Sequence, residues 1–377
     1  MKRVLFMPFL RISSGHHHVA DGIIKYLEEM EEEFDCEKVD ILSYTYGPVE
    51  KLVSLTYLKW IHSFPDFYSW LYRQAAIKTK PDQKRAYRLF KLLFLSRMRK
   101  LIAEKKPDVI ICTHALPSFL LNELKTKKIH SIPVMNVYTD YFINQIWGTD
   151  TIDYHLVPSR EIMEELVNKG VNPEQIHVTG IPVHPHIRRN QTIQETKTDF
   201  SVLISGGNLG AGALKTLIQK LQPSGRIRYL VLCGKNEKLY QFIDQLNHPK
   251  IRALPYISSK LEISMFYDEA DAIITKPGGV TVSECLMKKI PIFIYHALPG
   301  QEEVNFQFLI KKGLAFELRD WEKEGKVEKH ILAVLQSKQQ LEQLYKQVNQ
   351  YHAELAGDDF SDILKAVLSK MNEEKRT

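Results

Sequence analysis

The segment KPGGVTVSE, residues 276–284, places two adjacent glycines between an apolar run and a helical pattern. Glycines at a strand-to-helix junction let a ligand approach the backbone, and the free N–H groups of a helix start favour an anion such as phosphate. The carboxylate of Glu284, in the first helical turn, would then accept hydrogen bonds from ribose hydroxyls. An alternative interpretation is a capping box, in which Thr281 and Glu284 satisfy their own helix start.

Two further segments carry groups suited to the same ligand. In LPGQEEVN, residues 298–305, Gln301 offers a donor and an acceptor and Glu302 offers an acceptor, so both can bind vicinal sugar hydroxyls. In SGGNLGAG, residues 205–212, the N–H groups of Ser205, Gly206, Gly207 and Asn208 can face a diphosphate. The alternatives are an acid-rich helix start for the first segment and a simple tight turn for the second.

Titratable residues follow two strands of the N-terminal half. In SSGHHHVA, residues 13–20, three histidines begin a helix, and neighbours about 100° apart on a helix do not form a chelating set. One of them can act as a general base, since imidazole titrates near neutral pH. Asp140, in VYTDY at residues 137–141, follows another strand. The alternatives are a polar helix start and a strand-terminating turn.

The order of elements predicts an α/β protein of two Rossmann-like domains facing a cleft. Apolar runs alternate with helical patterns, as expected for parallel sheets, first up to about residue 181 and again from residue 200. The expected parts are an N-terminal domain at 1–185, a linker at 186–199, a C-terminal domain at 200–355, and a last helix at 356–377 that packs back on domain one.

Residues 51–106 are strongly basic, with 14 Lys and Arg against three Asp and Glu, although the whole chain carries only +6. Aromatic residues are frequent in the same segment. We expect an anionic membrane surface as its partner, with Leu89, Phe90, Leu93, Phe94, Met98 and Leu101 on one apolar helix face. The alternative is an ordinary amphipathic helix packed on the sheet. The segment contains no nucleic-acid-binding motif.

Composition predicts a cytoplasmic protein. No run of 18 apolar residues is present, no cleavage site follows the apolar run 4–10, and the four cysteines are widely spaced. No Asp-x-Asp motif occurs, so we expect no metal and no cofactor at the site. Helix dipoles and backbone amides would then neutralise a diphosphate.

The stretch TKPGGVTVSECLMKKIPIFIYHALPGQEEVNFQFLIKKGLAF resembles the donor-binding half of glycosyltransferase family 28, which includes diacylglycerol glycosyltransferases. The segments PDVIICTHALPS, IPVMNVYTDY, YHLVPS and QIHVTGIPV extend this resemblance over nearly the whole chain. The resemblance implies a GT-B fold and metal-independent, inverting transfer of a hexose from a UDP-sugar to a membrane lipid such as diacylglycerol.

The resemblance also implies roles for particular residues. Gly278, Gly279 and Thr281 would lie beside the diphosphate, Glu284 beside the ribose, and Gln301 and Glu302 beside the hexose. Tyr256 and Ile257 would lie near the uracil. His16 would be the general base, with Asp140 as the alternative.

Two other functions stay open at this point. A sugar-nucleotide 2-epimerase would share the donor site without needing an acceptor, and a non-catalytic protein could bind a sugar nucleotide without turnover. For the transferase we expect a peripheral position on the inner face of the cell membrane.

Overall fold

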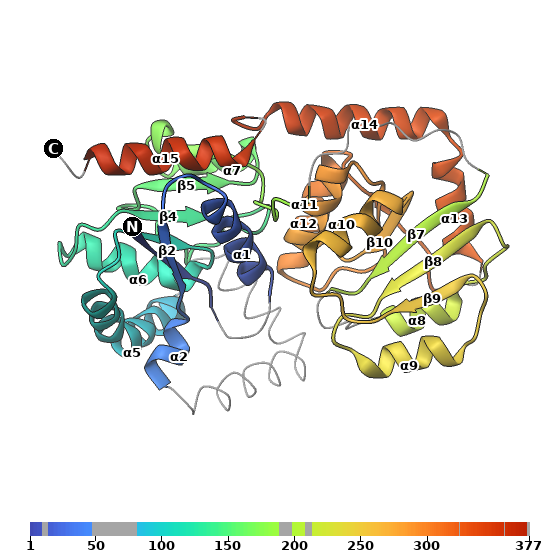
Figure 1. The fold of residues 1–377 in the computed structure, drawn as a ribbon, viewed down its shortest axis with the longest axis horizontal. Helices are drawn as coiled ribbons and strands as arrows, with labels where there is room; N and C mark the ends of the chain where they lie inside the picture. The colour runs from blue at the N-terminus through green and yellow to red at the C-terminus, as the bar shows by residue number, and fades with distance from the viewer. Residues whose placement is uncertain are drawn as a thin grey trace. The chain divides into compact units, whose positions relative to one another are not determined.

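The computed structural model describes residues 1–9, 14–46, 81–187, 198–207, 213–323, 325–357 and 359–374. The chain divides into two compact units, the first formed by Met1–His184 with Glu354–Thr377 and the second by Pro185–Ala353. Figure 1 shows a parallel sheet with covering helices in each unit. Each unit therefore has its own α/β core.

In unit 1, the described residues form a six-stranded sheet in which neighbouring strands run parallel, in the order β2-β1-β3-β4-β5-β6. The strands are β1 (Lys2–Met7), β2 (Phe34–Lys38), β3 (Val109–Cys112), β4 (Val134–Val137), β5 (Tyr154–Val157) and β6 (Ile176–Val178). The helices are α1 (Gly15–Glu28), α2 (Ile41–Tyr46), α5 (Pro81–Lys105), α6 (Ala115–Thr126), α7 (Arg160–Asn168) and α15 (Phe360–Glu374), with the 3-10 turn η2 (Pro173–Gln175).

In unit 2, the described residues form a second six-stranded parallel sheet, in the order β12-β11-β10-β7-β8-β9. The strands are β7 (Phe200–Ser205), β8 (Ile227–Leu232), β9 (Ile251–Leu254), β10 (Ala272–Thr275), β11 (Ile292–Ile294) and β12 (Phe316–Glu317). The helices are α8 (Leu214–Lys220), α9 (Glu237–Gln245), α10 (Lys260–Glu269), α11 (Gly279–Lys288), α12 (Gln301–Lys311), α13 (Lys326–Leu335) and α14 (Lys338–Ala353).

Both sheets have a point where the strand order reverses. In unit 1 the chain leaves β1 toward β2 on one side and later returns to β3 on the other. In unit 2 the equivalent reversal lies between β7 and β10, which gives the doubly wound order typical of dinucleotide-binding domains. In open parallel sheets, ligands bind beyond the carboxyl ends of the strands at this switch point.

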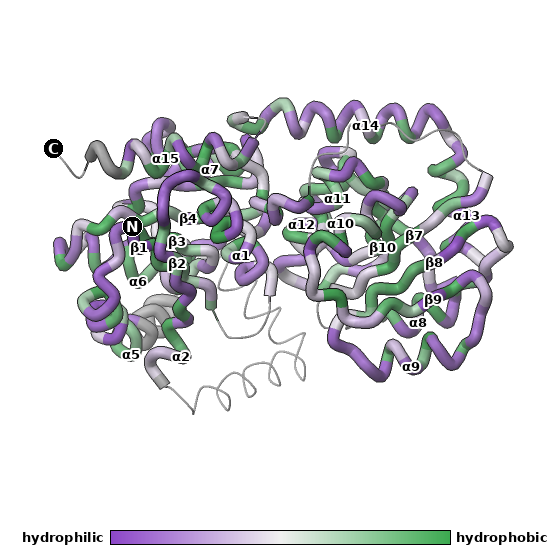
Figure 2. The backbone as a smooth tube through the Cα atoms, viewed as in Figure 1, coloured by the Kyte–Doolittle hydropathy of each residue, from purple (hydrophilic) through white to green (hydrophobic). Residues whose placement is uncertain are grey.

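The central strands of both sheets are buried on both faces, which stabilises the sheets. All four residues of β3, β4, β5 and β10 are buried, which is why these segments read as continuous apolar runs. The hydropathy colouring in Figure 2 shows hydrophobic strands inside unit 2 and a largely hydrophilic α14. The strands thus supply the apolar core, and helices such as α14 carry polar side chains along their exposed faces.

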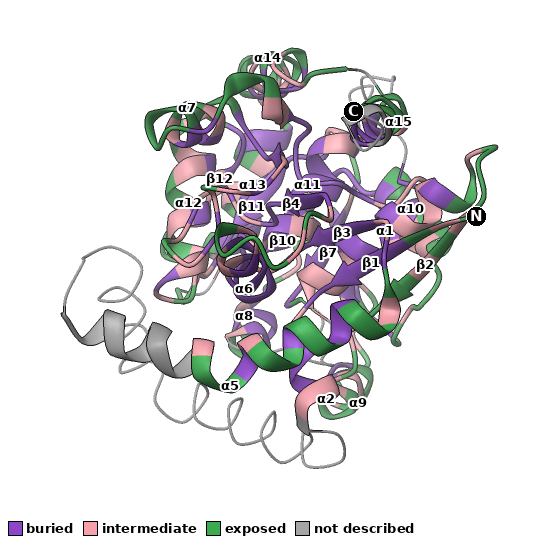
Figure 3. Cartoon of the chain, turned by 90° about the vertical axis from the view of Figure 1, so that its left-hand side faces the viewer, coloured by how far each residue is buried: buried purple, intermediate pink, exposed green. Residues whose placement is uncertain are grey.

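Part of the apolar face of α5 that was predicted to contact a membrane is buried in the core of unit 1. Phe94, Met98 and Leu101 are buried in one cluster with residues of α2 and α6, so for these three residues the membrane assignment is wrong. An amphipathic period is the same whether a helix face meets a lipid or a protein core. Figure 3 shows buried and exposed positions alternating along the described part of α5. Side chains of Leu89 and Phe90 lie outside the described residues.

The last helix belongs to unit 1. The backbone N–H of Ala356 donates to the carbonyl of Val178 over 2.7 Å, and the rings of Tyr26 and Phe360 lie 5.1 Å apart. These contacts join the C-terminal segment to β6 and α1. The chain therefore crosses from unit 2 back to unit 1 near residue 354.

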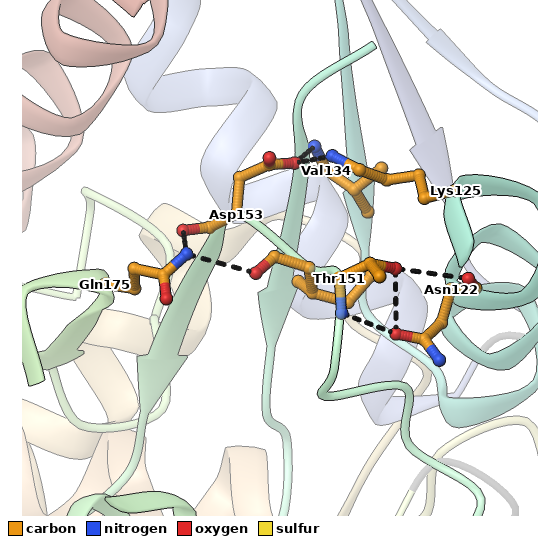
Figure 4. A network of polar contacts seen from close by, with 7 residues as sticks. Asn122, Lys125, Val134, Thr151, Asp153 and Gln175 are labelled. Atoms are coloured by element: carbon orange, nitrogen blue, oxygen red, sulfur yellow. Dashed lines mark hydrogen bonds and ion pairs between the residues drawn. The ribbon is translucent and has the colours of Figure 1, made fainter. Parts of the chain in front are cut away.

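A polar network fixes the amino edge of the unit 1 sheet (Figure 4). The Asp153 carboxylate accepts from the Val134 N–H over 2.6 Å and pairs with Lys125. The Asn122 side-chain oxygen accepts from both the N–H and the hydroxyl of Thr151. Val134 begins β4 and Asp153 precedes β5, so this network lies at the edge opposite the switch point. Its role is structural.

Candidate functional site

The switch point of unit 1 brings His16 against the ends of two neighbouring strands. His16 is the second residue of α1, which directly follows the loop after β1. Its Nδ1 lies 2.8 Å from the carbonyl oxygen of Thr113, just beyond β3, and 2.9 Å from Oγ1 of Thr139, just beyond β4. The sequence therefore placed His16 correctly at a strand edge.

The proton position on His16 follows from these contacts. A carbonyl oxygen can only accept a hydrogen bond, so Nδ1 must carry the proton and donate it to Thr113. In the neutral ring, Nε2 then keeps its lone pair, and the described residues make no hydrogen bond to it. His16 as a whole is half-buried, and an Nε2 that keeps its lone pair is suited to remove a proton.

The surroundings of His16 lower its pKa below 6.5. Burial is the largest cause, and the charge of His17 adds to it, whereas Asp140 and the Thr113 carbonyl raise the pKa. The ring of His114 meets that of His16 edge to face at 4.7 Å, and Phe9 stacks on His114. His16 is therefore neutral, and able to act as a base, near pH 7.

Asp140 lies close enough to His16 to act on it electrostatically, so the structure brings the two candidate bases together. His16 has fixed geometry, because strands β3 and β4 supply its two anchors. Sequence reasoning missed Thr139 as part of this site. Its position directly before Asp140, at the end of an apolar strand, was the available signal.

In unit 2, α11 starts at the switch point with glycine as its N-cap. Gly278 is the N-cap, and among the described residues no side chain caps this helix. The capping-box interpretation is therefore wrong, since Thr281 lies inside the first turn. Gly278 has an ordinary extended backbone, and a Cβ built on it would meet no atom within 4 Å. The protein itself thus has no steric need for glycine here, which is the pattern expected when a ligand approaches.

Lys276 lies two residues before that helix start and is 8 % exposed. Its Nζ is 3.8 Å from Oε1 of Glu302, and Oε2 of Glu302 accepts from the N–H of Leu298 over 2.7 Å. The amide of Asn305 donates to the carbonyl of Pro277 over 3.1 Å. These contacts hold the start of α12 against the loop before α11. Sequence reasoning missed Lys276, although it stands inside the quoted motif.

Gln301 is the first residue of α12 and is half-buried. Its N-cap, Gly300, has φ of 103°, a conformation that favours glycine. The turn predicted at Pro299 and Gly300 is confirmed. Gln301 and Glu302 consequently lie on the same first turn, beside the loop that carries Lys276.

Glu284 is buried and already holds two partners. Its Oε1 pairs with Nζ of Lys260 at 2.7 Å, and its Oε2 accepts from the hydroxyl of Tyr267 at 2.9 Å. Burial and the neighbouring carboxylate raise the pKa of Tyr267 well above its usual value, so the phenol stays a donor. A carboxylate has about four acceptor positions, and these two contacts use two of them. No local sequence signal links Glu284 to partners on α10.

The remaining candidates lie at the carboxyl edge of the same sheet. Ser205 ends β7 beside Thr275 of β10, and its hydroxyl accepts from the N–H of Gly207 over 3.3 Å. Gly206 is buried between them, whereas Asn208 lies outside the described residues. Tyr256 is 44 % exposed after β9, with Nζ of Lys235 5.1 Å from its ring centre, and Ile257 follows it. Thr281 and Gly279 lie in the first turn of α11.

Comparisons with known proteins agree with this architecture. Residues 16–183 match the model of monogalactosyldiacylglycerol (MGDG) synthase, and residues 201–360 match the glycosyltransferase family 28 C-terminal domain. The chain is similar to crystallised MurG of Acinetobacter baumannii, with a TM-score of 0.62 at 17 % identity, covering 98 % of this chain and 100 % of that one. It is also similar to UDP-GlcNAc 2-epimerase from Neisseria meningitidis bound to UDP-GlcNAc, with a TM-score of 0.55 at 12 % identity and the same coverage.

Two relatives are closer in sequence. The uncharacterized glycosyltransferase YkoN of Bacillus subtilis (strain 168) is 45 % identical over 372 residues, 98 % of each chain. A processive diacylglycerol beta-glucosyltransferase of Bacillus mycoides (strain KBAB4) is 33 % identical over 277 residues, covering 71 % of this chain and 70 % of that protein. The two sheets and their switch points thus match the GT-B fold, and the family models and relatives identify the chain as a glycosyltransferase. The chain belongs to glycosyltransferase family 28.

Proposed function

We propose that this glycosyltransferase moves a hexose from a UDP-sugar to a membrane lipid such as diacylglycerol, with inversion and without a metal. The observation that carries the proposal is the start of α11: an uncapped glycine helix start beside the buried Lys276, at the switch point of unit 2. Family membership and the relatives' lipid-directed activities support it.

The donor half of the proposal follows from charge. When the bond between the anomeric carbon and the diphosphate breaks, negative charge develops on UDP. N–H groups at the starts of α11 and of the loop after Ser205, together with Lys276, would stabilise it. Each preorganised donor of this kind contributes about 2.7–4 kcal/mol of barrier lowering in comparable sites. Glu284 would bind the ribose, Gln301 and Glu302 the hexose, and Tyr256 and Ile257 the uracil.

The acceptor half depends on His16. Its Nε2 would remove the proton of the acceptor hydroxyl as that oxygen bonds to the anomeric carbon from the face opposite UDP. The C–O bond to UDP breaks in the same step, and the electron pair leaves with the diphosphate. General-base catalysis typically contributes about 10²–10⁴-fold in rate. Asp140, which raises the pKa of His16, would stabilise the imidazolium that forms.

The acceptor also requires a membrane surface. No helix in the described part of the chain combines the length and hydrophobicity that a bilayer span requires. Leu92 and Leu93 on α5 are 81 % and 43 % exposed, and the exposed Arg97, Arg99 and Lys100 follow them. Apolar side chains next to basic ones are the composition of an interfacial helix. We therefore assign membrane contact to this exposed side of α5 and not to the buried face with Phe94, Met98 and Leu101. This assignment supports a peripheral position on the inner leaflet.

The test is product analysis with three labelled donors: UDP-glucose, UDP-galactose and UDP-N-acetylglucosamine. Purified protein is incubated with each donor and membrane extract, and lipids are separated by thin-layer chromatography. The proposal predicts label in a chloroform-soluble glycolipid with one donor. Epimerised donor without an acceptor would instead support a 2-epimerase, and donor binding without any product would support a non-catalytic binding protein.

A further inference from the structure

The hydroxyl of Thr139 contacts the nitrogen of His16 that does not perform chemistry in the proposed reaction. Nδ1 of His16 lies between two oxygens, the Thr113 carbonyl at 2.8 Å and Thr139 Oγ1 at 2.9 Å. Because the Thr113 carbonyl requires a proton on Nδ1, Thr139 Oγ1 meets an N–H and accepts from it. The proton is therefore shared between two acceptors.

We propose that Thr139 is a positioning residue that accepts a second hydrogen bond from the Nδ1–H of His16 and so fixes the direction of Nε2. The inference rests on the proposed function, in which Nε2 of His16 is the general base. Thr139 acts through His16 and need not touch either substrate. Its role resembles that of an outer hydrogen-bond partner that sets the orientation of a working histidine.

The anchors come from rigid elements, which is what a positioning role requires. Thr113 directly follows β3, and Thr139 is the second residue after β4. These strands pair in register from Ile110 with Val134 to Cys112 with Asn136. Thr139 is 5 % exposed, so its hydroxyl has little access to water. Two acceptors on neighbouring strands fix the plane of the ring, whereas one would leave it free to pivot.

A third contact restrains the ring from another side. His114 meets His16 edge to face with ring centres 4.7 Å apart, and Phe9 stacks on His114 at the same distance. His114 is itself held, because its Nδ1 accepts from the N–H of Leu116 at the start of α6. The described contacts thus occupy Nδ1 and one side of the ring and leave Nε2 for the acceptor.

The charged and titratable groups near His16 determine what loss of Thr139 does to its pKa. Asp140 after β4 raises the pKa, whereas His17 on α1 lowers it, and His114 after β3 lies in ring contact. An acceptor on Nδ1 favours the imidazolium, since the charged ring donates more strongly. Removing the Thr139 oxygen therefore lowers the pKa of His16 further, whereas the Thr113 carbonyl still keeps the proton on Nδ1.

The experiment compares Thr139→Val, which keeps the shape of the side chain but removes the oxygen, with Thr139→Ser, which keeps the oxygen. For Thr139→Val we expect kcat to fall about tenfold with the donor KM unchanged. This fall is smaller than the full contribution of general-base catalysis, because His16 itself is still present. The acid limb of kcat/KM should move to lower pH. Thr139→Ser should restore most of the rate. Thr126→Val is the matched control, because it removes a hydroxyl that donates only within α6, to the carbonyl of Asn122.

His16→Ala, assayed in parallel, separates the two possible failures. If His16→Ala keeps the full rate, the proposed base is wrong and this inference falls with it. If His16→Ala loses activity while Thr139→Val keeps the wild-type rate and pH profile, only the inference is overturned. Histidine ¹⁵N NMR of the wild-type protein, with the His16 signal assigned by its absence in His16→Gln, gives a readout without turnover. An Nε2–H tautomer would overturn the inference even if the Thr139 variants did not fold.

Discussion

At the scale of single residues, the proposed chemistry depends on a few side chains whose partners fix their geometry. His16 is neutral because burial lowers its pKa, and its Nδ1 proton is fixed by a carbonyl. The Glu284 carboxyl group pairs with Lys260 and accepts from the Tyr267 hydroxyl, so helix α10 fixes its orientation. Both residues are thus held before any substrate binds, which reduces the reorganisation that the reaction requires.

A general base with a lowered pKa makes a specific pH prediction. The neutral imidazole is the active form, so kcat/KM should fall as the pH drops through the His16 pKa, with a midpoint below 6.5. His16→Ala should lower kcat by about 10²–10⁴-fold and remove this acid limb. His18→Ala, two residues further along α1, is the control. It should keep the wild-type kcat and the acid limb of the pH profile. Initial rates between pH 5 and 8 measure the effect, and an acid midpoint above pH 7 would contradict the assignment.

At the scale of elements, the sites are built where helices begin beside strand ends. Helix α11 begins at Gly278 after β10, and α12 begins at Gln301 after Gly300. Asn305 and Glu302 of α12 bond to the loop that carries Lys276 and Pro277. Three segments far apart in the sequence, after β7, β10 and β11, therefore form one edge of unit 2.

The start of α11 is tested by Gly278→Ala. The backbone conformation accepts alanine and the added Cβ meets open space, so the free energy of unfolding should change by no more than about 1 kcal/mol. The same Cβ would occupy the space proposed for the diphosphate. We expect the donor KM to rise at least about tenfold with the unfolding midpoint in urea nearly unchanged. A wild-type donor KM would show that no ligand approaches this glycine.

Gly148→Ala is the opposite case and tests the loop that follows β4. A Cβ at Gly148 would lie 2.4 Å from Cβ of Asn122 and 2.8 Å from the carbonyl oxygen of Ser118. The backbone of Gly148 is also held by Asn136, which donates to its carbonyl, and by Ser118, which accepts from its N–H. We expect a loss of about 1–3 kcal/mol in unfolding free energy, measured by urea denaturation. Wild-type stability would mean that this loop is not packed as described.

At the scale of the whole molecule, most of the fold was predictable from local pattern. Runs such as 109–112 and 272–275 are apolar at every position because both faces of a parallel sheet are covered. The glycines at 278 and 300 marked two helix starts correctly. The burial of one face of α5 was not predictable, because the same apolar pattern occurs on helices that contact a protein core and on helices that contact a membrane. Lys260 and Tyr267 were missed because they reach Glu284 from another helix.

The membrane assignment is tested on the exposed side of α5. Arg97→Glu with Lys100→Glu reverses two charges on the same helix face as Leu93, and each basic residue near an anionic leaflet contributes about 1 kcal/mol. We expect binding to phosphatidylglycerol vesicles at low salt to weaken at least about tenfold. Lys338→Glu with Lys346→Glu makes the same charge change on the exposed face of α14 and serves as the control. If both double variants lost vesicle binding equally, the binding would reflect the overall charge of the protein and not a specific surface on α5.

The proposed donor site in unit 2 is tested most directly by calorimetric titration of UDP into the whole protein. We expect saturable binding of one UDP per chain with Kd below about 1 mM, near the usual range for substrates. We also expect clearly weaker binding to Glu284→Gln, a variant that keeps the side-chain shape but removes the carboxylate. Absence of saturable binding at millimolar UDP, or an unchanged Kd in Glu284→Gln, would contradict the proposed donor site.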